Sequence, residues 1–245
     1  MISASMETPL PQAQVLGLPL HLAADYSQWL ADRVRSRQGT HVVTLNAEMA
    51  MQAQQDPQLA AVIQGAELVV PDGAGVVFYL RLRRQRIQRS PGIEVAENLV
   101  IQAAQEGWSV FLLGGAPGVA QAAGDRWQAR YPQLTIAGVH HGYFTDADEA
   151  HLTETLRRAN PQIILVALGV PRQEFWIQTH RALCPGAVWM GVGGSFDIWA
   201  EVKSRAPEWL RENHLEWSYR LYQEPHRWRR MMALPKFAWK ALRGQ

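Results

Sequence analysis

Cysteine is nearly absent from this chain: Cys184 is its only one in 245 residues. A disulfide framework and a multi-cysteine metal cluster are therefore excluded, and a reducing compartment is expected. No apolar run approaches the roughly 18 residues that a membrane-spanning helix needs. No Lys or Arg precedes the short apolar patch at 15–20, so a secretory signal is not expected either. These absences predict a soluble, cytoplasmic protein.

The chain has neither an excess nor a shortage of charged or apolar residues. Hydrophobic residues make up 47% and charged residues 19%, a balance that excludes disorder, collagen-like repeats and coiled coil. The length fits one large domain or two small ones.

Basic and aromatic residues are unevenly distributed. The last twenty residues hold six Lys or Arg and no Asp or Glu, whereas the preceding 225 hold more acidic than basic residues. Five of the ten tryptophans follow residue 198. A basic, Trp-rich terminus suits an anionic membrane surface, and nucleic acid would also accept it. A solvated helical face with core tryptophans explains the composition equally well.

Short β-rich runs alternate with longer amphipathic runs. Several of the strands are continuously apolar, as in a parallel sheet covered by helices on both faces, so the pattern predicts a doubly wound α/β fold. The expected strands are 41–45, 67–70, 109–113, 134–139, 162–168 and 187–192, and the expected helices are 48–64, 74–84, 94–106, 117–131, 147–159 and 172–183.

Turn residues follow five of the expected strands. They are Asn46, then 71–73 (Pro-Asp-Gly), 114–115 (Gly-Gly), Gly169 and 193–194 (Gly-Gly). Such residues end many strands, but ligands of open α/β sheets bind at the carboxyl ends of the strands, where glycines let backbone N–H groups approach phosphate. Five turns at one edge favour a nucleotide or phosphate ester as the ligand.

Common nucleotide and hydrolase motifs are missing. Neither 114–118 nor 191–196 satisfies G-x-G-x-x-G, and no Walker A, G-x-S-x-G or H-E-x-x-H sequence is present. Asp146 and Asp148 form a D-x-D, but they follow Thr145 at an expected helix start, where acids serve as caps. We therefore expect no metal and no cofactor.

The chain changes character near residue 205. We expect a doubly wound α/β domain over 1–204 and a basic, Trp-rich helical appendage over 205–245, interrupted at Pro225. Gln173 stands at an expected helix start, where it would either hydrogen-bond a ligand or cap the helix. Arginines of the appendage are candidates for binding a diphosphate, because guanidinium pairs bidentately with phosphate oxygens.

Blocks of sequence in one order give a specific resemblance. They are 44–49 (TLNAEM), 71–73 (PDG), 89–92 (RSPG), 111–115 (FLLGG), 141–144 (HGYF), 169–174 (GVPRQE), 191–197 (GVGGSFD), 205–207 (RAP) and 216–230. The chain resembles the WecG/TagA/CpsF family of bacterial glycosyltransferases over most of its length. It departs from the usual pattern at Ser90, Glu94 and Glu201.

The resemblance implies that 1–204 is a Rossmann-like α/β catalytic domain. It also implies an inverting, metal-independent transfer of a sugar, with N-acetylmannosamine as the expected sugar, from a UDP donor to a polyprenyl-diphosphate-linked GlcNAc. The reaction would belong to cell-surface polysaccharide or teichoic-acid-type synthesis. The resemblance assigns Asp72 as the catalytic base. It also implies a substrate-binding set made of Thr44, Asn46, Arg89, Gln173, Asp197, Arg220, Arg227 and Arg230. The expected partners are the donor, the lipid-linked acceptor and a membrane surface, with the protein peripheral at the inner face of the cell membrane.

The residues alone favour a simple Asp-Gly turn at 72–73, but the chemistry of the reaction agrees with the role that the resemblance gives to Asp72. An inverting transfer needs one carboxylate to take the proton of the acceptor hydroxyl, while UDP is already a good leaving group. Other hypotheses stay open: another UDP-sugar donor such as glucose, a nucleotide-sugar hydrolase or oxidoreductase, and a non-catalytic membrane- or nucleic-acid-binding α/β module. Within the transferase hypothesis nucleic acid is not a partner, and a homo-oligomer is compatible with the sequence.

Overall fold

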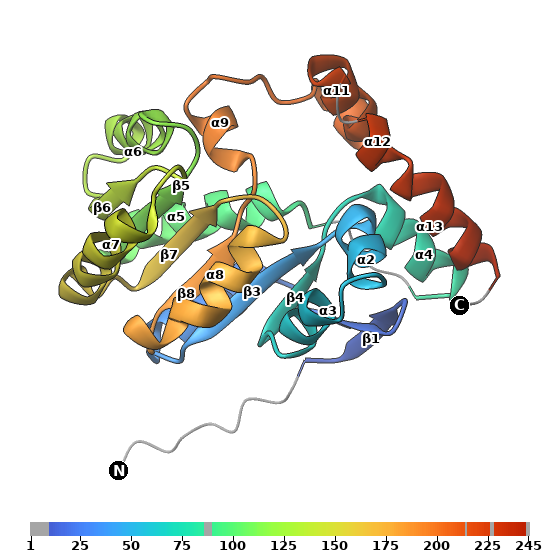
Figure 1. Ribbon diagram of the computed structural model, residues 1–245, viewed down its shortest axis with the longest axis horizontal. Helices are drawn as coiled ribbons and strands as arrows, with labels where there is room; N and C mark the ends of the chain where they lie inside the picture. Colours follow the sequence, from blue (N-terminus) through green and yellow to red (C-terminus); the bar gives the residue numbers. More distant parts are fainter. Residues whose placement is uncertain (1–9, 86–89, 214, 226–227, 244–245) are drawn as a thin grey trace, which may run out of the picture.

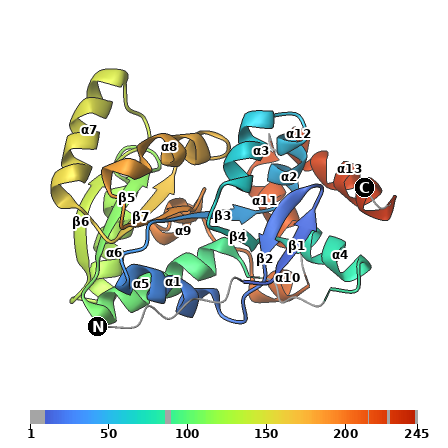
Figure 2. The ribbon, with the colours of Figure 1, turned by 90° about the horizontal axis from the view of Figure 1, so that it is seen from below.

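A computed structural model describes residues 10–85, 90–213, 215–225 and 228–243. Its centre is a six-stranded parallel sheet in the order β4-β3-β8-β7-β5-β6, with helices on both faces (Figures 1 and 2). The predicted Rossmann-like, doubly wound α/β class is confirmed. The strands are β3 (Thr40–Leu45), β4 (Leu68–Pro71), β5 (Ser109–Gly114), β6 (Thr135–His140), β7 (Ile163–Ala167) and β8 (Val188–Gly191).

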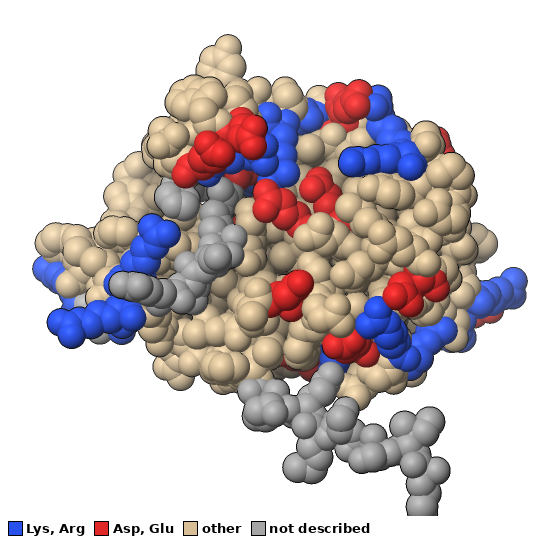
Figure 3. All heavy atoms as spheres, turned by 180° about the vertical axis from the view of Figure 1, so that it is seen from behind, with Lys and Arg blue, Asp and Glu red and all other residues tan. Residues whose placement is uncertain are grey.

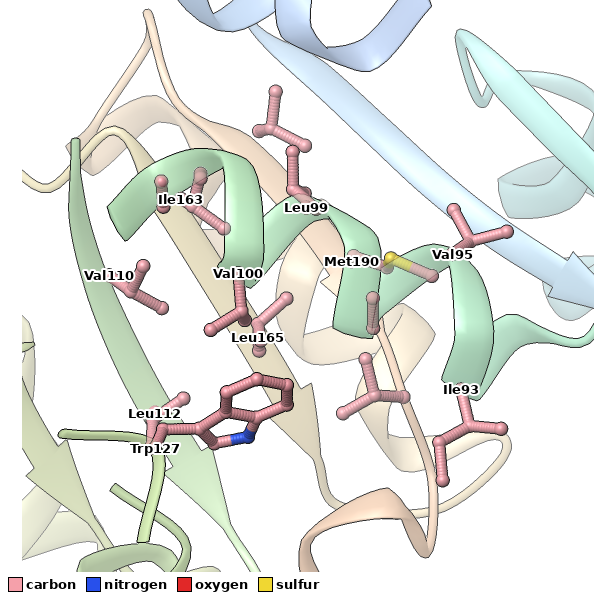
Figure 4. Close-up of a cluster of buried hydrophobic side chains, with 14 of the residues drawn as sticks. Ile93, Val95, Leu99, Val100, Val110, Leu112, Trp127, Ile163, Leu165 and Met190 are labelled. Carbon is pink, nitrogen blue, oxygen red and sulfur yellow. The ribbon is translucent and has the colours of Figure 1, made fainter. Parts of the chain in front are cut away.

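The two faces of the sheet bury different helices. One face packs against α1 (Tyr26–Arg35), α5 (Gly92–Glu106), α6 (Val119–Arg130) and α9 (Ser195–Trp199). Figure 4 shows Leu99 and Val100 of α5 lying over Val110, Leu165 and Met190 of three strands. The opposite face packs against α2 (Ala47–Ala53), α3 (Pro57–Gln64), α7 (Asp146–Ala159) and α8 (Arg172–His180), the last of which continues into a 3-10 turn (Arg181–Leu183). Burial on both faces explains the continuously apolar strands.

The structure corrects three sequence expectations. The helix predicted over 48–64 is two helices, because Asp56 caps α3 and Pro57 occupies its first turn. Residues 12–21 form an antiparallel hairpin of β1 (Gln12–Val15) and β2 (Leu18–His21), which was not expected. Helices α1 and α9 were also missed. The expected cap at the start of α7 is confirmed, since Thr145 and Asp148 form a capping box there.

Among the residues described after 207 there are four short helices: α10 (Glu208–Glu212), α11 (Glu216–Gln223), α12 (Trp228–Met231) and α13 (Ala233–Leu242). In Figure 1 they run along one side of the molecule from above the sheet edge to the C-terminus. Helix α13 packs against α2 and α4 (Ala74–Leu82), and its Phe237 and Ala241 are buried in the same core as β3. The described part of the chain contains no helix long and apolar enough to cross a membrane.

Candidate active site

A pocket of about 340 Å³ opens at the carboxyl ends of the strands, in the size range of small-molecule sites. Residues that follow β3, β4, β7 and β8 line it, together with α11 and the segment 203–206. Strands β3 and β8 are neighbours in the sheet although they are the first and last of its strands in the sequence. This is the kind of switch in strand order at which open α/β sheets bind ligands.

Asp72 lines this pocket directly after β4. Its backbone N–H donates to the carbonyl of Leu45, which continues the pairing of β4 with β3 and holds residue 72 at the edge of the sheet. Gly73 follows with a φ of +81°, a conformation that favours glycine, and α4 begins at Ala74. The turn therefore presents the Asp72 carboxylate at the start of a helix, inside the pocket.

Thr44 and Asn46 reach the pocket from the end of β3. The hydroxyl of Thr44 lies 3.4 Å from the carbonyl oxygen of Gly191 on β8, and a Cβ at Gly92 would come within 2.7 Å of the Thr44 methyl group. Oδ1 of Asn46 accepts a hydrogen bond of 2.9 Å from the N–H of Met49 and caps α2. The amide nitrogen of Asn46 is thus the group that can reach a ligand.

Gln173 lines the pocket but is only 1% exposed. Neighbouring groups form hydrogen bonds with both the nitrogen and the oxygen of its side-chain amide. Its Nε2 donates to Oε1 of Glu174 over 2.8 Å, and its Oε1 accepts from the backbone N–H of Gly193 over 3.1 Å. The other carboxylate oxygen of Glu174 lies 2.8 Å from Nε2 of His41. The side chain thereby fixes the loop after β8, a role that the expectation of a ligand contact or a helix cap did not include.

Asp197, on α9, does not line the pocket itself. Its Oδ2 lies 2.7 Å from Nζ of Lys203, which does line the pocket and lies 2.6 Å from Oε1 of Glu224 on α11. Burial lowers the pKa of Lys203, but its hydrogen bonds to Asp197 and Glu224 outweigh this effect and raise the pKa. Lys203 thus remains a cation that joins the α/β body to α11. Sequence reasoning missed Lys203, because it lies between the blocks 191–197 and 205–207 and belongs to neither.

Arg220 lies on the face of α11 that lines the pocket. Its Nη2 donates to Glu216 over 2.8 Å, one turn earlier. Burial lowers the pKa of Arg220, but the charges of Glu216 and Asp72 outweigh this effect and raise it. The structure therefore places this predicted cation in the electrostatic field of the predicted base. The i, i+4, i+8 spacing of Glu216, Arg220 and Glu224 could have revealed this face.

Arg205 attaches the start of the C-terminal helices to α5. It pairs with Glu94, and its Nη1 lies 3.9 Å from Glu97, which accepts a hydrogen bond from Trp199. Arg211 also reaches Glu94, over 3.7 Å. Glu94, one of the departures from the family pattern, therefore holds the segment that borders the pocket.

Three predicted site residues cannot be placed. Arg89 and Arg227 lie outside the described residues, and Arg230 belongs to α12 but its side chain is not described. Thr44, Asn46, Asp72, Gln173 and Arg220 are brought together around one pocket.

Known proteins resemble the chain throughout this region. It is 38% identical over 208 residues to an N-acetylglucosaminyldiphosphoundecaprenol N-acetyl-beta-D-mannosaminyltransferase of Bacillus spizizenii (strain ATCC 23059 / NRRL B-14472 / W23), a match covering 84% of this chain and 80% of the relative. A protein of the same name from Bacillus subtilis (strain 168) is 37% identical over the same shares. A sequence model of the glycosyl transferase WecG/TagA/CpsF family matches residues 13–245. The chain belongs to this family of glycosyltransferases.

Proposed function

We propose that this protein transfers N-acetylmannosamine from a UDP donor to GlcNAc linked through a diphosphate to a polyprenol. The main support is the position of Asp72, a carboxylate that follows β4, one strand away from the switch point between β3 and β8, in a pocket that also holds Asn46 and Arg220. Two relatives at 37–38% identity carry the corresponding name. The donor sugar is the part of the proposal that depends on those relatives.

In the proposed reaction, Asp72 takes the proton of the acceptor hydroxyl as that oxygen attacks the anomeric carbon. The bond from this carbon to the diphosphate breaks on the opposite face, UDP leaves, and the configuration inverts. Lys203 and Arg220 line the same pocket and supply positive charge for a diphosphate. Gln173 acts indirectly, by holding the N–H of Gly193 and with it the loop after β8.

The segment 205–245 serves in this proposal as a unit that joins the pocket to the membrane. One face of α11 lines the pocket, while Trp217 and Tyr222 of the same helix are exposed. Trp228 and Trp239 are exposed further along. Because the acceptor's lipid stays in the bilayer, a basic, Trp-bearing surface near the pocket would keep the enzyme peripheral at the inner membrane face.

The test is UDP release from UDP-N-acetylmannosamine, with and without a short-chain lipid-diphospho-GlcNAc. We expect acceptor-dependent release, and we expect Asp72→Asn to lower kcat by about a hundredfold or more while UDP still binds, since general-base catalysis typically contributes about 10²–10⁴-fold. Release without acceptor would indicate a hydrolase instead. Failure of UDP to bind the wild-type chain would refute the transferase proposal.

A further inference from the structure

Helix α4 exposes apolar side chains that are not part of the hydrophobic core. Its inner side is buried through Val76, Val77, Tyr79 and Leu80. Phe78 and Leu82 lie four residues apart, on one face, and are 47% and 45% exposed. Arg81 lies between them in sequence and is also exposed. An exposed helical stripe of this composition has no role in the core.

Helix α13 lies beside α4 and repeats the pattern. Trp239 and Leu242 are 56% and 66% exposed, and they are flanked by exposed Lys236 and Arg243. The guanidinium of Arg243 lies 4.2 Å from the centre of the Trp239 ring. We call the exposed residues Phe78, Arg81, Leu82, Arg83, Arg84, Lys236, Trp239, Leu242 and Arg243 the α4–α13 surface.

The charge of this surface has one sign. Neither helix contains an Asp or Glu. Figure 3 shows the same from behind: at the lower left edge of the molecule, where α4 and α13 lie, the coloured charged side chains are all Lys or Arg. Such a surface suits an anionic bilayer. The apolar and aromatic side chains can enter the boundary between headgroups and acyl chains, and the basic side chains can pair with anionic lipid headgroups.

The two helices are joined by a tight contact. Phe237 of α13 is 1% exposed, and its ring centre lies 5.7 Å from that of Tyr79 on α4. A Cβ at Gly75 would lie 3.8 Å from the Phe237 ring and 2.9 Å from the Cβ of Ala47, so α4 also approaches α2 closely at this glycine. Helices α4 and α13 are therefore packed against each other, so that the α/β body and the C-terminal helices form one unit at this place.

We propose that α4 is itself a membrane-contacting element and that the α4–α13 surface docks on an anionic lipid bilayer. This inference rests on the membrane association proposed above for 205–245, and extends it to the α/β body. It also links the bilayer to the reaction, because α4 begins two residues after Asp72. At about 1.5 Å per residue, its nine residues separate the pocket end from the outer end by about 13 Å. The acceptor sugar, joined through its diphosphate to a lipid in the bilayer, would have to reach across a similar distance from the bilayer to the pocket.

The test is cosedimentation of the full chain with vesicles of phosphatidylglycerol and phosphatidylcholine. We expect Arg81→Gln/Arg84→Gln to bind about 30-fold more weakly than wild type, since each basic residue near an anionic surface contributes roughly fivefold. Phe78→Ser/Leu82→Ser should also weaken binding. The matched control is Arg157→Gln/Arg158→Gln on α7, two exposed arginines on another part of the surface, which should bind as wild type does.

A second measurement reports contact directly. An environment-sensitive fluorophore on Leu82→Cys should shift to the blue when vesicles are added, whereas the same probe on Arg158→Cys should not. Cys184 is buried and does not compete for the label.

The possible failures are distinguishable. If wild type binds vesicles but the α4 variants bind equally well and the probe at position 82 does not shift, the role of α4 is refuted and membrane association stands. If the α7 control loses as much vesicle binding as the α4 variants, binding is not specific to the α4–α13 surface and the proposal is refuted. If wild type binds DNA but not vesicles, both the docking surface and the proposed membrane association are wrong.

Discussion

The Nε2 atom of His41 lies 2.8 Å from Oε2 of Glu174, and both side chains are fully buried although 133 residues separate them in sequence. Nδ1 of His41 is buried without a partner among the described residues. We therefore assign the ring proton of His41 to Nε2, which donates it in a hydrogen bond to the Glu174 carboxylate. The other oxygen of Glu174 accepts from Gln173, so this one carboxylate connects β3 to the wall of the pocket.

This pair predicts a contrast between two substitutions. Glu174→Leu removes the carboxylate that accepts from both His41 and Gln173, and we expect the free energy of unfolding to fall by about 1–3 kcal/mol for each buried N–H group left without that acceptor. Glu174→Gln should remain close to wild type, because its amide nitrogen can donate to Nε2 of His41 once the ring proton moves to Nδ1. Thermal denaturation and the donor KM measure both effects. A Glu174→Leu protein with wild-type stability and KM would contradict the arrangement.

Gly191 is expected to tolerate no side chain. A Cβ there would lie 2.4 Å from Nε2 of Gln173 and 2.6 Å from Oε1 of Glu174. We expect Gly191→Ala to lower the free energy of unfolding by about 1–3 kcal/mol, the usual cost of overpacking. Gly194→Ala is the matched control for stability, since its Cβ would meet nothing within 4 Å and its φ is −83°. Equal melting temperatures for the two variants would show that Gln173 and Glu174 do not pack closely against Gly191.

Lys203 should hold α11 against the body. It pairs with Asp197 and with Glu224, and it is 39% exposed. After allowance for screening by solvent, Lys203→Met should weaken the attachment by about 1 kcal/mol, which corresponds to about fivefold faster proteolysis of the C-terminal helices. The comparison is Arg157→Gln, which removes an exposed pair on α7 and should leave that rate unchanged. Unchanged proteolysis of the Lys203 variant would mean that other contacts hold α11.

Glu67 predicts a pH dependence of stability. Burial raises the pKa of its carboxyl, but hydrogen bonds from Arg181 and from the backbone N–H of His41, each 2.7 Å long, outweigh this effect and lower the pKa. A lowered pKa means that the stabilisation is present above the unfolded-state value of about 4.3 and is lost as the pH falls through the folded-state pKa.

We therefore expect Glu67→Gln to be less stable than wild type at neutral pH by about 1 kcal/mol, or about 2–4 °C in Tm, after discounting for the partial exposure of the carboxylate. The difference should shrink as the pH falls below the unfolded-state value of about 4.3 and through the folded-state pKa, because the wild-type carboxyl then becomes protonated as well. Thermal scans over a series of pH values from neutral into acid provide the measurement. A difference that persists unchanged in acid would show that the charge of Glu67 is not its cause.

The class of fold and the edge of the sheet at which the pocket forms could both be predicted from the amino-acid sequence. Continuous apolar runs such as 162–168 predict strands buried on both faces, and Asn46 and Asp72 follow their strands as a ligand-binding edge requires. The division of 48–64 was also visible locally, because Asp56 and Pro57 are a cap and a first-turn residue. These signals are readable because each acts within a few residues.

The strand order, the packing of α13 on α4 and the pairing of His41 with Glu174 became visible only in the folded chain. The same holds for Asp197, which pairs with Lys203 and is not among the residues that line the pocket. Each of these contacts joins segments far apart in the chain, where a single residue leaves no periodic signal. The reason is physical: such contacts depend on how packed layers bring surfaces together, and this is settled by burial over the whole core rather than by local propensity.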